Sequence, residues 1–324
     1  MVFFITVLRA LAACLITNAH YTGIYPTDLI ANGGLLGDVL FFAVSGYCLY
    51  NVKMSFPRWY GKRLYRVYPP VLIMTLIYVL LGAYSLADHN AVWWFIYPTY
   101  YHFVASIIVL YIPFYFCMKM DWIKEHIVCV MGAVAVIWLL FYFIIYDKSY
   151  YHIDTVREPM IRFLFMESML LGAWFRKNDV KIRNKFKIWY PFATLGMFLV
   201  YFASKLLFSR KEGPSQFQFL NQIAILALLT LMFMTFAGLD SKLEKFPWWI
   251  KKVISFLSSI TLEIYLVQYV LIDALRPIGH FPLNWIGLTT AILAAAFALH
   301  KVCELIYAGI DVVAKKIHGG GYDL

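Results

Sequence analysis

The sequence predicts an all-α membrane protein, a bundle of about ten transmembrane helices, and three observations lead to this fold class. Of the 324 residues, 62% are hydrophobic and only 14% are charged, unlike the composition of soluble globular domains. The mean hydropathy is +0.71. Apolar stretches of about twenty residues, long enough to cross a hydrocarbon core, alternate with short polar segments. We therefore expect a single integral membrane domain over residues 1–324, with no separate soluble domain.

Ten apolar segments are expected to span the membrane. The fourth is long and contains Pro98 and Pro113, so we expect a kink or an interfacial start there. The pairs Trp93-Trp94 and Trp248-Trp249 lie at predicted span ends, where aromatic residues are enriched. The first segment is not expected to be a cleaved signal, because it has no basic start and Arg9 interrupts it. The predicted spans are 3–20, 34–52, 68–87, 92–118, 127–146, 161–175, 189–208, 218–237, 253–272 and 285–308.

Lysine and arginine residues set the expected orientation. They concentrate in alternate loops, and the loop before the third span, KMSFPRWYGKRLYR, is the clearest case. By the positive-inside rule both termini are cytoplasmic. The net charge of +10 reflects this bias together with attraction to anionic lipid headgroups. We expect no nucleic-acid partner, because no soluble domain presents a basic surface.

Several function classes are disfavoured by what the sequence lacks. Its five cysteines and eight histidines show no spacing typical of a metal site or a disulfide framework, so no metal is expected. Neither a Walker-type loop nor a Rossmann glycine fingerprint is present, which argues against an ATP-driven pump. No repeat relates the two halves, which weakens the case for an inverted-repeat transporter but leaves that class open.

The first span keeps two polar residues, Arg9 and His20. They are eleven positions apart, close to three helical turns, so both point from one helix face with roughly 16 Å between them along the axis. Charged residues at membrane depth normally face the bundle interior or a wet cavity. The alternative is that Arg9 snorkels to the cytoplasmic headgroups while His20 caps the outer end of the helix.

Asp38 lies little more than one turn inside the outer end of the second span, at the expected depth of His20. A carboxylate in this position needs a cation or hydrogen-bond donors. Pairing with His20 would fix the imidazole tautomer and leave the other ring nitrogen free as a general base. The alternative is a hydrogen bond that only joins the first two spans, and the small residues Gly37, Ser45 and Gly46 suit such close packing.

Arg63 and Arg66 precede the third span and are three residues apart, so they share one side of a short helix. With Arg58 and Lys62 nearby they form a cradle that suits phosphates, because guanidinium groups bind phosphate through bidentate, charge-assisted hydrogen bonds. An ordinary positive-inside loop is the alternative interpretation.

Four motifs, in this order and on these membrane faces, resemble acyltransferase family 3. They are Arg9 and His20 with ten residues between them, GDVLFFAVSGYCL, RLYRVYP and SSITLEIYLVQ. The resemblance covers essentially the whole chain, including its ten-helix layout. The family consists of integral membrane O-acyltransferases that modify bacterial surface glycans. The resemblance therefore implies a multi-pass enzyme of the bacterial cytoplasmic membrane that transfers an acyl group, most simply acetyl from acetyl-CoA.

The resemblance also implies roles for individual residues. His20 matches the essential histidine, Arg9 the basic residue of the first-helix motif, and Asp38 the acidic residue ahead of the FF-x-x-SG signature. Arg63 and Arg66 match the R-x-x-R motif that engages coenzyme A. The chain departs from the pattern at two positions, where Gln268 stands in place of a frequent histidine and Glu263 in place of a small or polar residue. Further candidates for substrate binding are Arg162, Glu263 and Gln268.

These roles combine into one mechanistic hypothesis. Coenzyme A phosphates dock on Arg63 and Arg66, and the pantetheine arm reaches through the bundle toward His20. Oriented by Asp38, His20 removes the proton from an acceptor hydroxyl, which attacks the thioester directly; an acyl-histidine intermediate is the alternative route. Arg9 steers the donor or stabilises negative charge. The acceptor is a glycan or a lipid-linked sugar, and outer loops such as DKSYYHIDTVREPM offer aromatic rings beside hydrogen-bonding groups.

The main competing class is a transporter or flippase of a glycan or small anion. It also predicts inward-facing polar residues and access from both membrane sides, so the fold alone does not separate the two classes. Broken helices with matching glycine or proline interruptions in two halves would favour a transporter, and the sequence gives no convincing sign of them. A membrane glycosyltransferase or polymerase would need larger outer loops than this chain has.

Overall fold

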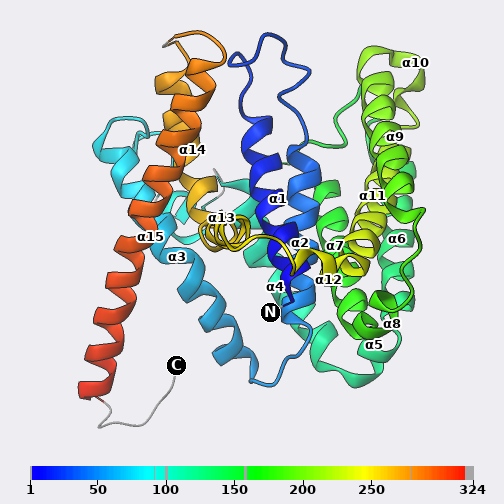
Figure 1. The fold of residues 1–324 in the computed structure, drawn as a ribbon, viewed down its shortest axis with the longest axis horizontal. Helices are drawn as coiled ribbons and strands as arrows, with labels where there is room; N and C mark the ends of the chain where they lie inside the picture. Colours follow the sequence, from blue (N-terminus) through cyan, green and yellow to red (C-terminus); the bar gives the residue numbers. More distant parts are fainter. Residues whose placement is uncertain (1, 91, 99–100, 157–158, 278, 318–324) are drawn as a thin grey trace. The chain divides into compact units, whose positions relative to one another are not determined.

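The computed structural model (Figure 1) describes residues 2–90, 92–98, 101–156, 159–277 and 279–317. Within these ranges every regular element is a helix, which confirms the predicted all-α class for the described chain. The chain divides into two compact units. Unit 1 comprises residues 1–12, 35–53 and 106–255, and unit 2 comprises residues 13–34, 54–105 and 256–324.

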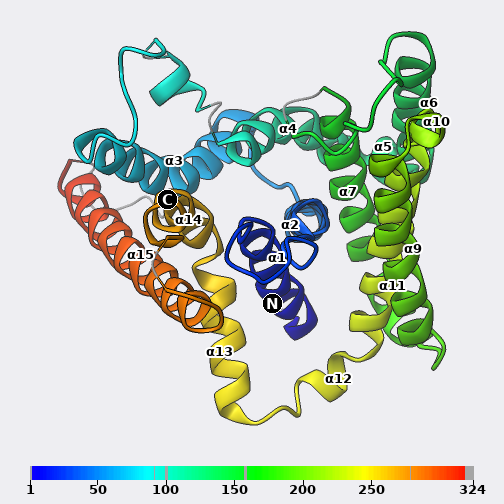
Figure 2. The same cartoon turned by 90° about the horizontal axis from the view of Figure 1, so that it is seen from above.

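Unit 1 holds most of the helices. The helices of unit 1 are α2 (Gly34–Leu49), α4 (His102–Lys119), α5 (Asp121–Glu125), α6 (Ile127–Ile144), α7 (Pro159–Lys177), α8 (Asp179–Arg183), α9 (Tyr190–Arg210), α10 (Glu212–Ser215), α11 (Phe219–Gly238), α12 (Asp240–Leu243) and most of α13 (Trp248–Ser259). Helix α11 packs against α9, α7 and α8, while α6 packs against α7. Figure 2 shows α9 and α11 side by side.

Unit 2 is built on three long helices and a short π-helix. Its helix α14 packs against α15 and α3, and α3 also contacts α15 and the π-helix η1 (Figure 2). The first helix, α1 (Phe3–Ala19), begins in unit 1 and ends in unit 2. The helices of unit 2 are α3 (Phe56–Leu80), η1 (Val92–Ile96), α14 (Thr261–Leu275) and α15 (Leu283–Ile317).

A helix overlaps each of the ten predicted spans. Among the described residues, six helices are long and apolar enough to cross a membrane, and α13 with α14 passes the same test as a bent pair. Helices α1 and α2 are apolar but shorter. Helix α7 is less apolar, because Arg162, Glu167 and Arg176 lie within its 19 residues.

The predicted ninth span, 253–272, is not one straight helix. Helices α13 and α14 are bent by 71° at a break between Ser259 and Thr261. The Ser259 hydroxyl donates to the Phe256 carbonyl at 2.7 Å, and the Thr261 hydroxyl donates to the Ser258 carbonyl at 3.3 Å. Such side-chain bonds give the backbone an alternative to regular helical pairing, which explains a break that hydropathy does not reveal.

The third span begins earlier than predicted. The third was expected to begin at residue 68, but α3 begins at Phe56, with Pro57 in its first turn. Proline is well tolerated there, because the first helical N–H groups have no partner within the helix. The Arg63–Arg66 pair therefore lies on the same helix as the span. The fourth has the separate start expected from Pro98, since η1 precedes α4.

Helix α2 and helix α7 pack backbone against backbone at two glycines. A Cβ atom added to Gly46 would lie 1.9 Å from the Met169 carbonyl oxygen, and one added to Gly172 would lie 1.8 Å from the Ala43 carbonyl oxygen. One turn away, the Phe42 and Phe165 rings stack with centroids 4.2 Å apart. Gly46 was expected to favour close packing, and the structure places that contact on α7.

The start of α1 is anchored by an acidic residue far along the chain. The Phe4 backbone N–H donates to Oδ1 of Asp240 at 2.8 Å, and α1 has no acidic residue in its own first turn. Oδ2 of Asp240 accepts from Arg183 at 3.1 Å, and Arg183 also pairs with Asp179 at 2.7 Å. The buried Asp240 carboxylate thus serves both as a cap for α1 and as a partner for a cation.

Replacing Asp240 with alanine is expected to lower the free energy of unfolding by about 2–4 kcal/mol, because both a buried ion pair and a helix cap are lost. Thermal unfolding of the detergent-solubilised protein measures this change. The control is Glu244→Ala one turn later, where the side chain is exposed; it should stay within about 0.5 kcal/mol of wild type. Equal stability of the two variants would contradict the anchoring role.

Candidate functional site

His20 lies on the turn directly after α1, in unit 2. Its backbone N–H donates to the Thr17 carbonyl at 3.0 Å, which closes the last turn. The half-buried imidazole meets the ring of Tyr269 on α14 edge to face, with centroids 4.9 Å apart. One helical turn beyond Tyr269, the Asp273 carboxyl lies within electrostatic range of the imidazole. The histidine is therefore held by ring packing, within electrostatic range of a carboxylate of its own unit that also pairs with Arg276 at 3.1 Å.

An aromatic cluster extends this environment. Tyr269 packs near Tyr265, with centroids 5.5 Å apart, and Tyr101 lies 6.0 Å from each of these rings. Phe103 packs against Tyr265 at 5.5 Å. The Tyr101 side chain is fully buried. Tyr269 is the member of this cluster that contacts His20, and the buried rings behind it hold Tyr269 in place.

Asn18 makes three hydrogen bonds to the loop that follows His20. Nδ2 of Asn18 donates to the carbonyls of Ile30 and Asn32 at 2.8 and 2.9 Å, and its Oδ1 accepts from the Tyr25 hydroxyl at 2.6 Å. Gly23 sits at φ +78°, which few other residues adopt. The loop beside the histidine is thus fixed by hydrogen bonds within unit 2, and its geometry is preorganised.

Arg63 and Arg66 lie on the first half of α3. The Arg63 guanidinium carbon lies 5.5 Å from the centre of the buried Trp59 ring, a cation–π contact that orients the group. Arg66 is exposed, and its carbonyl accepts from the Tyr307 hydroxyl of α15 at 3.5 Å. Both cations are on one helix of unit 2 beside α15, as the sequence predicted for a helical R-x-x-R motif.

Helix α3 also connects the level of the arginines to the level of His20. Twelve residues after Arg66, the Tyr78 hydroxyl donates to the Leu266 carbonyl of α14 at 2.8 Å, one turn before Tyr269. At 1.5 Å rise per residue, the arginine pair and the histidine are separated along the helix by roughly 20 Å.

Glu263 and Gln268 occupy different environments on α14. Oε1 of Glu263 is 2.7 Å from Nδ1 of His300 on α15, and Nε2 of His300 lies 3.4 Å from Glu304. This arrangement ties the two helices together, so Glu263 has a structural partner. Gln268 is fully buried, and neither amide atom has a hydrogen-bond partner among the described residues. Sequence reasoning missed His300, although a buried carboxylate such as Glu263 calls for a nearby donor.

Unit 1 contains the remaining predicted site residues. Nη2 of Arg9 lies 3.6 Å from the Cys48 sulfur of α2. Asp38 is buried in the first part of α2, and Arg162 lies in the first turn of α7. His20 and Asp38 belong to different units, so their pairing stays a prediction.

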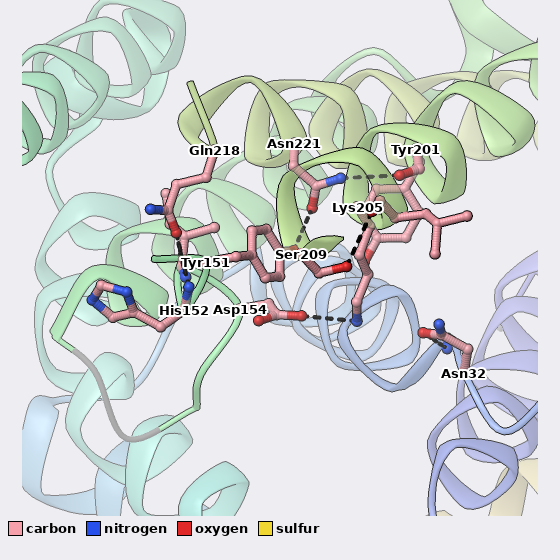
Figure 3. A network of polar contacts seen from close by, with 12 residues as sticks. Asn32, Tyr151, His152, Asp154, Tyr201, Lys205, Ser209, Gln218 and Asn221 are labelled. Carbon is pink, nitrogen blue, oxygen red and sulfur yellow. Dashed lines mark hydrogen bonds and ion pairs between the residues drawn. The ribbon is translucent and has the colours of Figure 1, made fainter. Parts of the chain in front are cut away.

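A polar network in unit 1 fixes the loop between α6 and α7 (Figure 3). The side chain of Gln218 accepts from the backbone N–H groups of His152 and Ile153. Asp154 forms an ion pair with Lys205 of α9 at 2.8 Å. The Tyr151 hydroxyl donates to Asn221 at 3.1 Å, and burial, with the nearby charge of Asp154, raises the Tyr151 pKa and keeps it a donor.

Comparison with known protein families decides the class of this site. The model of the family 3 acyltransferase domain matches residues 2–301. The chain belongs to acyltransferase family 3. No curated protein and no solved structure gives a significant match.

Membership of acyltransferase family 3 makes the chain a multi-pass membrane acyltransferase, with an acyl donor and an acceptor as its substrates. The matched range runs through both units and includes every site residue predicted from the sequence, from Arg9 to Gln268. Within acyltransferase family 3, the resemblance implied that His20 and the Arg63–Arg66 pair are functional. The structure places these residues in one compact unit.

Proposed function

We propose that the protein transfers an acetyl group from cytoplasmic acetyl-CoA to a hydroxyl of an extracytoplasmic glycan or lipid-linked sugar. The observation that carries this proposal is that unit 2 holds both His20 and the Arg63–Arg66 pair, roughly 20 Å apart along its helices. Phosphates bound by the arginines would leave the pantetheine arm long enough to bring the thioester to His20. This separation suits a donor that enters from one membrane side and reacts near the other.

In the proposed reaction His20 is the general base. One ring nitrogen takes the proton from the acceptor hydroxyl while the hydroxyl oxygen forms a bond to the thioester carbonyl carbon. The carbon–sulfur bond then breaks, and the proton passes to the departing thiolate, so that free coenzyme A is the second product. Asp38 orients His20, and Arg9 steers the donor or stabilises developing negative charge. A covalent acyl-histidine is the alternative route.

The proposal extends to the setting of the enzyme. The chain forms one integral membrane domain of the bacterial cytoplasmic membrane, with both termini cytoplasmic, as the distribution of basic residues favours. Arg162 is a candidate contact for the acceptor. No metal takes part in the proposed reaction, because His20 supplies the base and the thioester is already activated.

The test is the transfer of label from radiolabelled acetyl-CoA to surface glycan in membranes that contain the protein. The double variant Arg63→Ala with Arg66→Ala is expected to raise the KM for acetyl-CoA about tenfold to a hundredfold, since charge-assisted contacts to phosphate are lost. The value of kcat at saturating donor should change little, because the arginines lie far from the thioester.

The matched control is Lys185→Ala, which removes an exposed cation from another predicted cytoplasmic loop. Its KM should equal the wild-type value. An unchanged KM in the double arginine variant would contradict the donor site. An absence of labelled glycan with the wild type would contradict the acetyl-CoA-dependent reaction itself.

A further inference from the structure

The last two turns of α14 present one row of side chains to the segment that follows α1. Tyr269, Asp273 and Arg276 are four and three residues apart, so they lie on one side of the helix. The Tyr269 ring contacts His20. The Arg276 side chain packs on Gly23, where an added Cβ atom would lie 3.3 Å from Cδ of the arginine. Asp273 lies between these two contacts along the row, within electrostatic range of the imidazole. The row therefore places two charged groups beside the predicted base.

These two charged groups are open to solvent and keep hydrogen-bonding capacity. Nη2 of Arg276 donates to Oδ1 of Asp273 at 3.1 Å, and the two side chains are 43% and 76% exposed. Within the described residues neither side chain has a second hydrogen-bond partner. The guanidinium thus keeps all but one of its N–H donors, and the carboxylate keeps its second oxygen. An exposed pair of this kind contributes little to stability, so packing alone does not account for it.

The place of Arg276 in the chain is also unusual for a basic residue. Segments 20–33, 81–91 and 276–282 follow α1, α3 and α14, and Arg276 is the single lysine or arginine in their sequences. By the orientation proposed above these segments face away from the cytoplasm, where positive charge is depleted in membrane proteins. The positive-inside rule therefore does not explain an arginine at this position, and a ligand would.

A carboxylate next to a guanidinium has the chemistry to hold a sugar. Hydroxyl groups both donate and accept, so one of two neighbouring hydroxyls donates to the carboxylate while the other accepts from the guanidinium. We propose that Asp273 and Arg276 bind two neighbouring hydroxyls of the acceptor sugar and thereby direct a further hydroxyl of that sugar to His20. The inference rests on the proposed function for the acceptor class. It adds the residues that select the acceptor and the hydroxyl that is acylated.

The alternative is a structural role, in which Arg276 only packs on Gly23 and closes the end of α14. The two roles separate at the guanidinium group. The contact with Gly23 is made mainly by the methylene stem, since the Cδ and Cγ atoms lie 3.3 and 3.8 Å from the added Cβ. Methionine keeps an unbranched stem of similar shape and removes the charged donors. Arg276→Met therefore preserves the packing and removes the proposed sugar contact.

The experiment measures initial rates of label transfer from radiolabelled acetyl-CoA to surface polysaccharide, with the full-length protein in detergent. The polysaccharide is extracted from cells that carry the gene and is chemically de-O-acetylated. Arg276→Met is expected to raise the KM for polysaccharide about tenfold, because charge-assisted hydrogen bonds to the sugar are lost. The KM for acetyl-CoA and the temperature of thermal unfolding should equal the wild-type values.

The matched control is Lys301→Met, which removes the cation of another exposed ion pair in unit 2. Lys301 and Glu304 are three residues apart and 2.6 Å from one another. This variant should keep the wild-type KM for both substrates.

Three outcomes would count against the inference. A wild-type KM for polysaccharide in Arg276→Met would overturn the acceptor site. An equal rise in both KM values, or a lower unfolding temperature with loss of both activities, would assign Arg276 the structural role instead. A wild-type protein that releases coenzyme A from acetyl-CoA but labels no polysaccharide would overturn the glycan acceptor itself, which is a failure of the proposed function.

Discussion

Replacing His20 with alanine is expected to lower the rate of acetyl transfer by about 10²- to 10⁴-fold, because the acceptor hydroxyl loses its general base. The protein should remain folded, since the imidazole is half-buried and follows the last residue of α1. Its ring contact with Tyr269 supplies a small part of the packing of unit 2. The measurement is the initial rate of label transfer from acetyl-CoA to glycan, with thermal unfolding recorded on the same sample.

The control for this variant is His280→Ala, which removes an exposed histidine of the same unit. Transfer should continue at the wild-type rate. The two chemical routes are separated by incubation with labelled acetyl-CoA in the absence of acceptor, since only the covalent route leaves label on the wild-type protein. A folded His20→Ala variant that transfers at a near-normal rate would rule out both routes through this residue.

Replacing Gly46 or Gly172 with alanine is expected to destabilise unit 1 by an amount at or above the upper end of the roughly 1–3 kcal/mol typical of overpacking. Each new methyl group would meet a backbone carbonyl oxygen closer than 2 Å, and a backbone yields less readily than a flexible side chain. Helices α2 and α7 must then separate, which also weakens the Phe42–Phe165 stack. Yield and thermal unfolding in detergent measure the loss.

Gly132→Ala in α6 is the matched control, because a Cβ at this position meets nothing within 4 Å. That substitution should be neutral or slightly stabilising, since alanine has the higher helix propensity. Equal stability of all three alanine variants would contradict the backbone contact between α2 and α7 at Gly46 and Gly172.

The positions of the helices could be predicted from sequence because hydrophobicity is a property of whole segments. A run of about twenty apolar residues has few alternatives in a bilayer, where backbone groups must be paired internally. The break at Ile260 was missed for the opposite reason. It depends on single hydroxyls, those of Ser259 and Thr261, which change the average hydropathy of the segment very little.

The candidate site was predictable where its residues lie close together on one helix. Arg63 and Arg66 share a side of α3 because of their spacing alone. Contacts between distant segments carry no such local signal, so Tyr269 and Asp273 near His20 were missed, as was the partner His300 of Glu263. Asp273 is a carboxylate in the same unit as His20. The rate of label transfer in Asp273→Asn, compared with that in Asp38→Asn, shows which carboxylate orients the base, because the variant that loses this residue should be the slower of the two.

The α6–α7 loop is held through its main chain rather than through its side chains. Gln218 and Gln222 bond to main-chain atoms of residues 150–153, and these atoms are the same whatever side chain the loop carries. Side chains at exposed positions such as Tyr150 can therefore be exchanged while the loop keeps its path. The surface of this loop is thus free to diverge between related sequences, while its main chain and the packing of unit 1 stay the same.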